Sequence, residues 1–256
     1  MLIFNHDYKI RNMHEIEGIL KQRPRKILMV VYPHPDDETF GAGGLLLRAK
    51  KLGWKTIVVC LTKGGAGKIF VHGKGRSVVE IRQEEIKKAT NLLKVDELIL
   101  GDFPDAYLNR RVDQWSIWLK SLIQKYSPLI LVTYDHSGLT ANPDHIIVSL
   151  ELLQIVKQLK SKPELFWNTI DTNNKKLVKH IVDKRVVEFV SDPTHILTLN
   201  IYERLSKFLA FFQYKSQFPL KEIISIGGFI FKNKYEWYHM VDLEKTYKHK
   251  FVEFKL

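Results

Sequence analysis

The sequence predicts an α/β fold, a Rossmann-like doubly wound and mostly parallel sheet with helices on both faces. Three observations support this prediction. Apolar runs of strand length alternate with amphipathic stretches of helix length. The runs are nearly continuous and rich in β-branched residues, which is typical of strands covered on both faces. The connections are short, and alternating strands and helices joined in this way form parallel sheets.

The elements of the first half follow one another in regular order. Strands are predicted at 26–32, 56–62, 97–102 and 128–134, and helices at 40–52, 78–94 and 113–126. The apolar residues of the helical stretches recur at helical spacing, whereas those of the strands are consecutive. A further helix is expected from Asp144 to about Lys160.

The second half continues the pattern and then departs from it. Strands are predicted near 164–170 and 195–200, and a helix from Ile201 to about Tyr214. The tail from Gly228 alternates aromatic and polar residues, which favours an antiparallel edge strand. Neither a linker nor an internal repeat interrupts the chain, so we expect one domain over 1–256. It divides into an N-terminal extension (1–25), a core (26–217) and a C-terminal edge segment (218–256).

Composition and charge are ordinary for a globular protein. The chain has 256 residues, of which 45% are hydrophobic and 27% charged, and no apolar run reaches membrane-spanning length. The net charge of +12 comes from lysines spread along the chain, which favours a solvated surface over a nucleic-acid site. The start lacks the order of a signal peptide, and the single cysteine, Cys60, has no disulfide partner. We therefore expect a cytoplasmic protein, and a homo-oligomer stays open.

Two glycine-rich segments invite a nucleotide-binding interpretation that their spacing contradicts. In the segment 64–68 the glycines are wrongly spaced for a phosphate loop, and Ile69 stands where Ser or Thr would bind magnesium. The segment 41–44 fails the dinucleotide spacing as well. Both are more typical of tight turns and close approach between helix and sheet.

The most informative segment is Pro33-His34-Pro35-Asp36-Asp37-Glu38, directly after the first strand. It crowds an imidazole and three carboxylates onto one turn, at the strand end where open α/β sheets place their ligands. Adjacent acidic side chains repel one another unless a positive charge lies among them. A divalent metal supplies that charge, and His34 and Asp37 can both point at one ion.

A second cluster, Asn142-Pro143-Asp144-His145, follows the fourth strand and precedes a helix. Because parallel strands end at the same edge of a sheet, both clusters should meet there. His34, Asp37 and His145 would then hold a metal through two nitrogens and one oxygen. Three protein ligands with one open position are typical of catalytic zinc, and iron or cobalt could fill the same ligands.

Two acidic residues of the first cluster do not belong to this predicted ligand set. Asp36 would lie beside the metal without binding it, where a carboxylate can act as general base on zinc-bound water. Glu38 would lie in the first turn of a helix, whose positive end favours acidic groups.

These motifs together resemble the LmbE/PIG-L family of zinc-dependent N-acetylglucosaminyl deacetylases. Weaker matches run in the same order from about residue 26 to 217. They are Leu61 to Gly64 after the second strand, Arg82 with Glu85, Phe103 to Asp105, and Lys215 to Gln217.

The resemblance implies the same metal ligands and the same base, together with a reaction. A hydrolase of this kind removes the acetyl group from an N-acetylglucosamine-containing small molecule and releases acetate and an amine. The resemblance also implies that Arg82 and Asp105 contact the sugar or the group attached to it. Alternatively, Arg82 pairs with Glu85 on its helix and Asp105 caps a turn.

The chain departs from the family pattern at two positions. Asn142 stands where family members usually have a histidine that steadies the oxyanion; asparagine can donate a hydrogen bond there but supplies no proton at neutral pH. Asp144, which would orient that histidine, loses its partner. Either Asp36 makes both proton transfers or His136 replaces the missing imidazole at the substrate, and we favour Asp36 alone. Tyr214 replaces a second family histidine, which leaves the far wall of the pocket open.

Two other functions compete with deacetylation of an amino sugar. One keeps the metal chemistry and changes the substrate to another N-acyl amine or a thiol-conjugate amide. The other is a metal-bearing carbohydrate-binding protein that has lost catalysis. The presence of Asp36 argues against this last function, because a binding protein has little use for a base beside the metal.

Overall fold

The computed structural model describes residues 13–23, 26–67, 69–71, 75–174, 178–179 and 181–247. Parts of the predicted N-terminal extension (1–12, 24–25) and of the C-terminal segment (248–256) therefore lie outside the described residues. Within the described ranges, one sheet of eight strands has the order β1-β7-β8-β6-β5-β2-β3-β4. The strands are β1 (His14–Glu15), β2 (Ile27–Tyr32), β3 (Lys55–Thr62), β4 (Glu97–Phe103), β5 (Ile130–Tyr134), β6 (Glu164–Thr169), β7 (His195–Thr198) and β8 (Tyr235–Met240).

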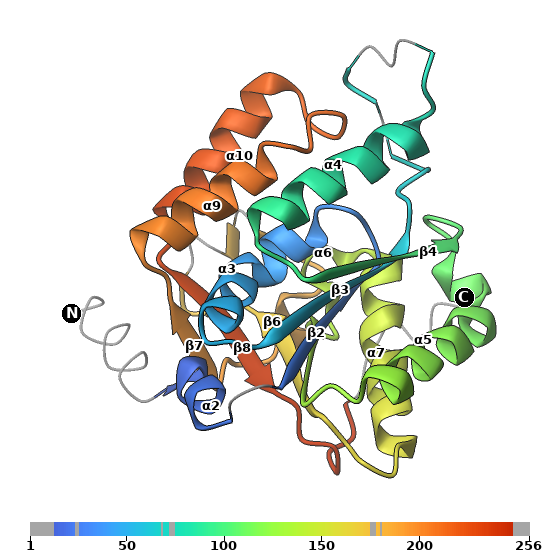
Figure 1. Cartoon of the computed structure of the whole chain (residues 1–256), viewed down its shortest axis with the longest axis vertical. Coiled ribbons are helices and arrows are strands. Elements are labelled where there is room, and N and C mark those ends of the chain that lie inside the picture. The colour runs from blue at the N-terminus through green and yellow to red at the C-terminus, as the bar shows by residue number, and fades with distance from the viewer. Residues whose placement is uncertain are drawn as a thin grey trace.

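Helices cover both faces of this sheet, as predicted (Figure 1). One apolar cluster contains buried residues of α2 (Ile16–Gln22), α3 (Asp37–Lys51), α4 (Val78–Leu92), α9 (Ile201–Phe211) and α10 (Leu220–Lys232). The opposite cluster contains α5 (Val112–Tyr126) and α7 (Pro143–Gln158). Short helical turns lie at α6 (Gly138–Ala141), Leu108–Arg110 and Val187–Phe189.

Strand β2 shows why its sequence is apolar throughout. Leu28 and Val30 point into the first cluster, whereas Met29 and Val31 point into the second. Successive side chains of a strand face opposite sides of the sheet, so a strand with helices on both sides needs apolar residues at every position. The same alternation holds in β3, and the doubly wound prediction is confirmed.

Side-chain caps set the starts of three helices. In α4, Ser77 accepts a hydrogen bond from the Glu80 backbone and the Glu80 carboxylate accepts one in return. Asn200 and Glu203 form the same reciprocal pair at the start of α9. Asn142 caps α7 alone, with Pro143 in the first turn. These residues satisfy backbone donors that the helix itself leaves unpaired.

The predicted edge strand of the C-terminal segment is antiparallel, but the edge position is wrong. β8 lies between β6 and β7 and pairs antiparallel with both, and the segment from Gly228 begins inside α10. The alternation of polar and aromatic residues was misleading because Glu236 is buried. Its carboxylate accepts hydrogen bonds from Lys207, from Tyr238 and from two backbone N–H groups of α3.

Gly44 is what lets this carboxylate reach α3. A methyl group at Gly44 would lie 2.2 Å from Leu199 Cδ2 and 3.0 Å from Glu236 Oε1. We expect Gly44→Ala to lower the free energy of unfolding by about 1–3 kcal/mol, because overpacking displaces these groups. Urea unfolding of the purified variant measures the change.

Gly18→Ala is the matched control for this substitution. Gly18 is also helical, and a methyl group there meets nothing within 4 Å. The control should gain about 0.5–1 kcal/mol from helix propensity. An unfolding midpoint for Gly44→Ala equal to that of the parent protein would contradict the close approach.

The order of the strands creates the place for a site. The chain runs from β2 through β3 to β4 in one direction and returns to β5 on the other side of β2. Helices therefore leave β2 and β5 toward opposite faces, which opens a crevice at their carboxyl ends. Both sequence clusters follow these two strands.

Candidate metal centre

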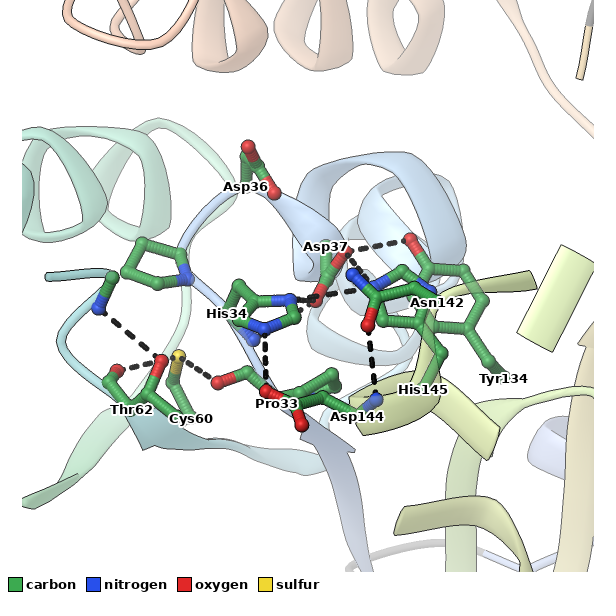
Figure 2. A network of polar contacts seen from close by, with 12 residues as sticks. Pro33, His34, Asp36, Asp37, Cys60, Thr62, Tyr134, Asn142, Asp144 and His145 are labelled. Atoms are coloured by element: carbon green, nitrogen blue, oxygen red, sulfur yellow. Dashed lines mark hydrogen bonds and ion pairs between the residues drawn. The ribbon is translucent and has the colours of Figure 1, made fainter. Parts of the chain in front are cut away.

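Three side chains of the two clusters meet at this crevice (Figure 2). His34 Nδ1 lies 3.3 Å from Asp37 Oδ2 and 3.3 Å from His145 Nε2. His145 Nε2 lies 3.4 Å from Asp37 Oδ1. His34 comes from the turn after β2, Asp37 from the first turn of α3 and His145 from the first turn of α7. The structure thus brings together the three residues predicted as ligands.

The spacing of these atoms fits a tetrahedral metal. With bonds of about 2.0–2.1 Å, two ligand atoms of tetrahedral zinc lie about 3.4 Å apart. The three side chains are nearly buried, with 11%, 6% and 8% of the His34, Asp37 and His145 side chains exposed. The residues present therefore fit a metal ion held by two nitrogens and one carboxylate.

The outer nitrogens of the two histidines support the same conclusion. His145 Nδ1 lies 3.3 Å from the Gly138 carbonyl oxygen, which can only accept, so this nitrogen carries the proton. His34 Nε2 lies 3.1 Å from Asp105 Oδ1 and 3.2 Å from Asp144 Oδ2. When both rings are neutral, each inner nitrogen carries the lone pair that a metal ion binds. Such outer hydrogen bonds are common around metal-bound histidines.

Tyr134 is a residue of this centre that the sequence did not single out. Its hydroxyl donates to Asp37 Oδ1 at 3.0 Å, and its ring stacks on His145 with centroids 4.5 Å apart. The other Asp37 oxygen accepts from the His34 backbone N–H at 2.9 Å. Burial opposes the charge of Asp37, but His145 and His34 lower its pKa to about 2. The sequence signal was only its position, as the last residue of a strand that precedes a polar loop.

A second group, His34 with Asp105 and Asp144, also has the spacing of metal ligands. It shares His34 with the first group, and hydrogen bonds account for its geometry. Asp144 Oδ2 accepts from the Ala106 backbone N–H at 2.8 Å and Oδ1 accepts from that of Leu108 at 3.2 Å. Burial favours neutral His34, but the hydrogen bonds that its ring donates to Asp105, Asp144 and Asp37 raise its pKa well above the usual range. The first group is therefore the candidate metal centre.

Asp144 contacts His34 Nε2, whereas the family pattern would have it orient a second histidine. Replacing it with asparagine keeps the shape but weakens the hold on His34 Nε2, and we expect metal affinity to fall about 10–100-fold. Competition with a chromophoric chelator measures this affinity. Asp113→Asn, on the exposed surface of α5, is the control. An unchanged metal affinity in Asp144→Asn would contradict a role of Asp144 in holding His34.

Asp36 lies beside the three ligands without joining them, and the backbone there is strained. Its φ is 106°, a value that non-glycine residues rarely adopt, and such strain is concentrated at functional sites. Burial and the neighbouring Asp37 raise the pKa of Asp36 well above its usual range, while Arg82 acts in the opposite direction. The residue lines the cavity beside the ligands. A carboxylate with a raised pKa at this point suits a general base.

Glu38 has the structural role predicted for it. It is 1% exposed and accepts hydrogen bonds from the Asp36 backbone, the Thr39 hydroxyl and the Tyr214 hydroxyl. These contacts hold the strained turn. Tyr214 is fully buried against Glu38 and is absent from the residues that line the cavity in the described part of the chain.

Arg82 holds two loops of the site together. Its guanidinium donates to the Gly64 carbonyl at 3.0 Å and to the Pro35 carbonyl at 2.8 Å, and it lies 3.5 Å from Asp36 Oδ2. A methyl group at Gly64 would lie 2.2 Å from Arg82 Nη1, so this glycine makes room for the guanidinium. The alternative pairing of Arg82 with Glu85 gives way to another contact, since Glu85 accepts two hydrogen bonds from Ser216.

Comparison with known proteins agrees with this geometry. The family model described as GlcNAc-PI de-N-acetylase, PIG-L, matches residues 29–156, half of the chain. The chain belongs to the PIG-L family. A probable N-acetyl-alpha-D-glucosaminyl L-malate deacetylase 2 from Bacillus anthracis is 27% identical over 128 residues, which are 46% of this chain and 54% of the relative. The match thus spans about half the length of that relative.

Solved structures share the fold of this PIG-L family member along most of its length. The N,N'-diacetylchitobiose deacetylase from Pyrococcus horikoshii has a TM-score of 0.65 at 19% identity, over 94% of both chains. The 4-carboxy-2-hydroxymuconate hydratase from Pseudomonas putida also has a TM-score of 0.65, at 15% identity, over 85% of this chain and 96% of its own. Because a deacetylase and a hydratase share this architecture, the fold alone does not select the reaction.

The structure separates His136 from the site of this PIG-L family member. Its ring stacks on Trp167 at 4.7 Å between centroids, and Nδ1 lies 3.4 Å from the Ser191 hydroxyl and 3.6 Å from Asp135. His136 is absent from the residues that line the metal-centre cavity within the described part of the chain. This packing does not support the predicted contact of His136 with substrate, which stays a prediction. The positive φ values of Leu139 and Ala141 mark the turn that carries the chain past it to Asn142.

Asn142 and Asp105 do lie on the cavity of this family member. Asn142 Oδ1 accepts a hydrogen bond from the Asp144 backbone N–H at 2.9 Å. The amide nitrogen of Asn142 is then the atom that can donate a hydrogen bond to a ligand in the cavity. Asp105 Oδ2 accepts from the Ala66 backbone N–H at 2.9 Å. Contact of Asp105 and Arg82 with a sugar stays a prediction.

The cavity also has walls that sequence reasoning missed. It measures about 830 Å³, and besides the metal centre it is lined by Ile226, Phe229 and Ile230 of α10. Apolar residues at a spacing of three to four indicate this helix, whereas the sequence analysis predicts a strand from Gly228 onward. Among the described residues, none of the helices has the length and hydropathy to span a membrane.

Proposed function

We propose that the chain is a metal-dependent hydrolase that removes the acetyl group from an N-acetylglucosamine-containing small molecule. One observation carries this proposal. Two imidazole nitrogens lie 3.3 Å apart, each lies 3.3–3.4 Å from one of the two Asp37 carboxylate oxygens, and Asp36 lines the cavity beside them. The family relationship and the relative named as an N-acetylglucosaminyl malate deacetylase support the choice of an amide of an amino sugar.

The proposed hydrolysis assigns one part of the reaction to the metal and another to Asp36. A bound divalent metal, which we propose to be zinc, would lower the pKa of a water molecule and polarise the carbonyl group of the amide. Asp36 takes the proton of the attacking water as the new carbon–oxygen bond forms. It returns this proton to the nitrogen as the carbon–nitrogen bond breaks, so that acetate and a free amine leave.

Asn142 and the positioning residues complete the proposed site. The Asn142 amide nitrogen can donate to the oxyanion of the tetrahedral intermediate, which is a major source of rate enhancement in acyl transfer. Asp144 fixes the orientation of His34, and Tyr134 that of Asp37. Because asparagine gives no proton, Asp36 is left to serve as base and then as acid.

The test is metal analysis coupled to a screen for amine release. The purified chain, loaded with zinc, iron or cobalt, is incubated with N-acetylglucosamine conjugates that differ in the attached group. Other N-acyl amines and thiol-conjugate amides form a second panel. Release of an amine from the first panel supports the proposal, whereas release from the second alone redirects it to another amide. Tight metal and sugar binding with no amine released from either panel would show a carbohydrate-binding protein.

A further inference from the structure

Helices α9 and α10 lie side by side on the outside of the molecule (Figure 1). Gly227 allows them to approach closely, since a methyl group there would lie 2.7 Å from the Phe208 ring. The Arg204 guanidinium donates to the Phe231 carbonyl at 2.7 Å, so the start of α9 lies beside the end of α10. The two helices are therefore antiparallel and present a common outer face.

This outer face is apolar. On α9, large aliphatic side chains recur every four residues at Ile201, Leu205 and Leu209. On α10, Leu220 and Ile224 have the same spacing. All five side chains are between 40% and 63% exposed. Because residues four apart lie on one side of a helix, each helix exposes an apolar stripe.

Three phenylalanines join the two stripes into one surface. The Phe208 ring lies 6.4 Å from that of Phe231 on α10 and 6.0 Å from that of Phe212, measured between centroids. All three residues are partly exposed. We call the outer patch the two stripes together with these three rings. Contiguous apolar surfaces of this kind mark sites of association.

The outer patch is distinct from the metal-centre cavity. From α10, the cavity is lined by Ser225, Ile226, Phe229 and Ile230, whereas Ile224 is absent from its lining. The aliphatic residues of the α9 stripe are absent from it as well. α10 is therefore apolar on two sides, and the cavity accounts for one of them.

Basic side chains border the outer patch. Lys215 Nζ lies 5.2 Å from the centre of the Phe212 ring, and the Arg204 guanidinium lies 4.9 Å from that of Phe231. Such long side chains can lay their stems on an apolar surface while the charge stays at its margin. Three more exposed lysines lie on α10 or directly after it, at Lys221, Lys232 and Lys234.

Carboxylates are scarce around the outer patch, and this selects its partner. Within 200–234, all of which the structure describes, Glu222 is the one exposed carboxylate, since Glu203 is buried against Arg48. A second copy packed about a two-fold axis would bring the same basic border against itself. An anionic lipid surface instead attracts this border, while leucine, isoleucine and phenylalanine side chains enter below the headgroups.

We propose that the outer patch docks the protein on the surface of an anionic lipid bilayer. The axes of α9 and α10 lie in the plane of the bilayer, with the apolar stripes below the headgroups and the basic border at the lipid phosphates. Docking of this kind is peripheral, and it does not depend on the proposed hydrolysis. Its failure would leave the proposed function intact.

Sedimentation with lipid vesicles tests the proposal. The purified chain is mixed with vesicles of phosphatidylcholine and phosphatidylglycerol in equal parts, and separately with vesicles of phosphatidylcholine alone. The mixed vesicles should bind about tenfold more tightly or better, because each basic side chain near an anionic surface contributes to binding. Added salt should weaken this binding through screening. Absence of binding to the mixed vesicles overturns the proposal.

Two pairs of variants locate the binding surface. Ile224→Ser should weaken vesicle binding about fivefold, because less apolar surface leaves water. Its matched control is Ile117→Ser, since Ile117 is 71% exposed on α5, across the sheet. Lys215→Ala should also weaken binding about fivefold. Its control is Lys125→Ala, since Lys125 Nζ lies 5.0 Å from the Tyr126 ring centre on α5.

The control variants should bind vesicles within about twofold of the parent protein. If they lose as much affinity as Ile224→Ser and Lys215→Ala, the basic surface as a whole binds lipid and the outer patch does not dock. The four variants change exposed side chains, and circular dichroism verifies that each is folded.

Two other partners would give different results. A second copy of the chain would appear in sedimentation equilibrium as a mass that rises with concentration and that Ile224→Ser reduces. An acidic partner helix would appear as tight binding of a model peptide with glutamate and leucine at helical spacing. Either result without vesicle binding overturns docking on a bilayer.

Discussion

Replacing Asp36 with asparagine should lower kcat by about 10²–10⁴, the range in which a positioned general base contributes. Asparagine has the same shape but cannot take a proton from water. Asp36 does not belong to the candidate ligand group, so the metal content of the variant should equal that of the parent protein. Steady-state kinetics on a substrate from the amine-release screen, with metal analysis of the same preparation, measure both quantities.

His136→Ala is the matched control for the Asp36 substitution. His136 is the other group considered for proton transfer, and it packs on Trp167 away from the cavity. Its removal should leave kcat within about twofold, whereas a hundredfold loss with metal retained would make His136 the acid. If Asp36→Asn instead loses its metal together with its activity, Asp36 is a ligand and the assigned base is wrong.

Removing the metal, or one of its ligands, should abolish activity. Chelation of the purified protein removes the ion, and His145→Ala removes one nitrogen of its two-nitrogen, one-oxygen ligand set. Metal binding also provides a readout independent of turnover. Zinc at about 100 times its Kd should raise the free energy of unfolding of the parent protein by about 2.7 kcal/mol. The rise in Tm should vanish in His145→Ala.

His239→Ala serves as the control for the ligand substitution. His239 belongs to β8, and its Nδ1 lies 2.7 Å from the Asp192 carbonyl oxygen. Zinc should stabilise this variant as it does the parent protein. Stabilisation of His145→Ala by zinc to the same extent would show that the ion binds elsewhere, for instance at His34 with Asp105 and Asp144.

The sequence was sufficient for the central strands and for the approach of the three predicted ligands to one another, because both depend on simple geometry. Continuous apolar runs mark strands with two covered faces, and β2, β3 and β5 match their predicted ranges within two residues at each end. Parallel strands end at one edge, so polar clusters after β2 and β5 had to approach each other. His34, Asp37 and His145 followed from that rule and from residue chemistry.

The remaining features depend on contacts between segments far apart in the chain. Asp144 binds His34 and the backbone of the loop 106–108, so its role is not visible from its neighbours in sequence. Glu236 looks like a surface residue of an edge strand until its partner Lys207 is known. Tyr214 likewise meets Glu38 across 176 residues. Such tertiary pairs reverse what local polarity indicates.

The interior position of β8 has a consequence for the order in which the protein can form during synthesis. β8 is the last strand described, and it joins the β2-to-β6 part of the sheet to β7 and β1. Until residues 235–240 have left the ribosome, β6 presents an unpaired edge that includes Phe166 and Trp167, both buried in the finished protein. Unpaired apolar edges invite aggregation. The growing chain therefore exposes this unpaired edge during synthesis of the roughly 65 residues between β6 and β8.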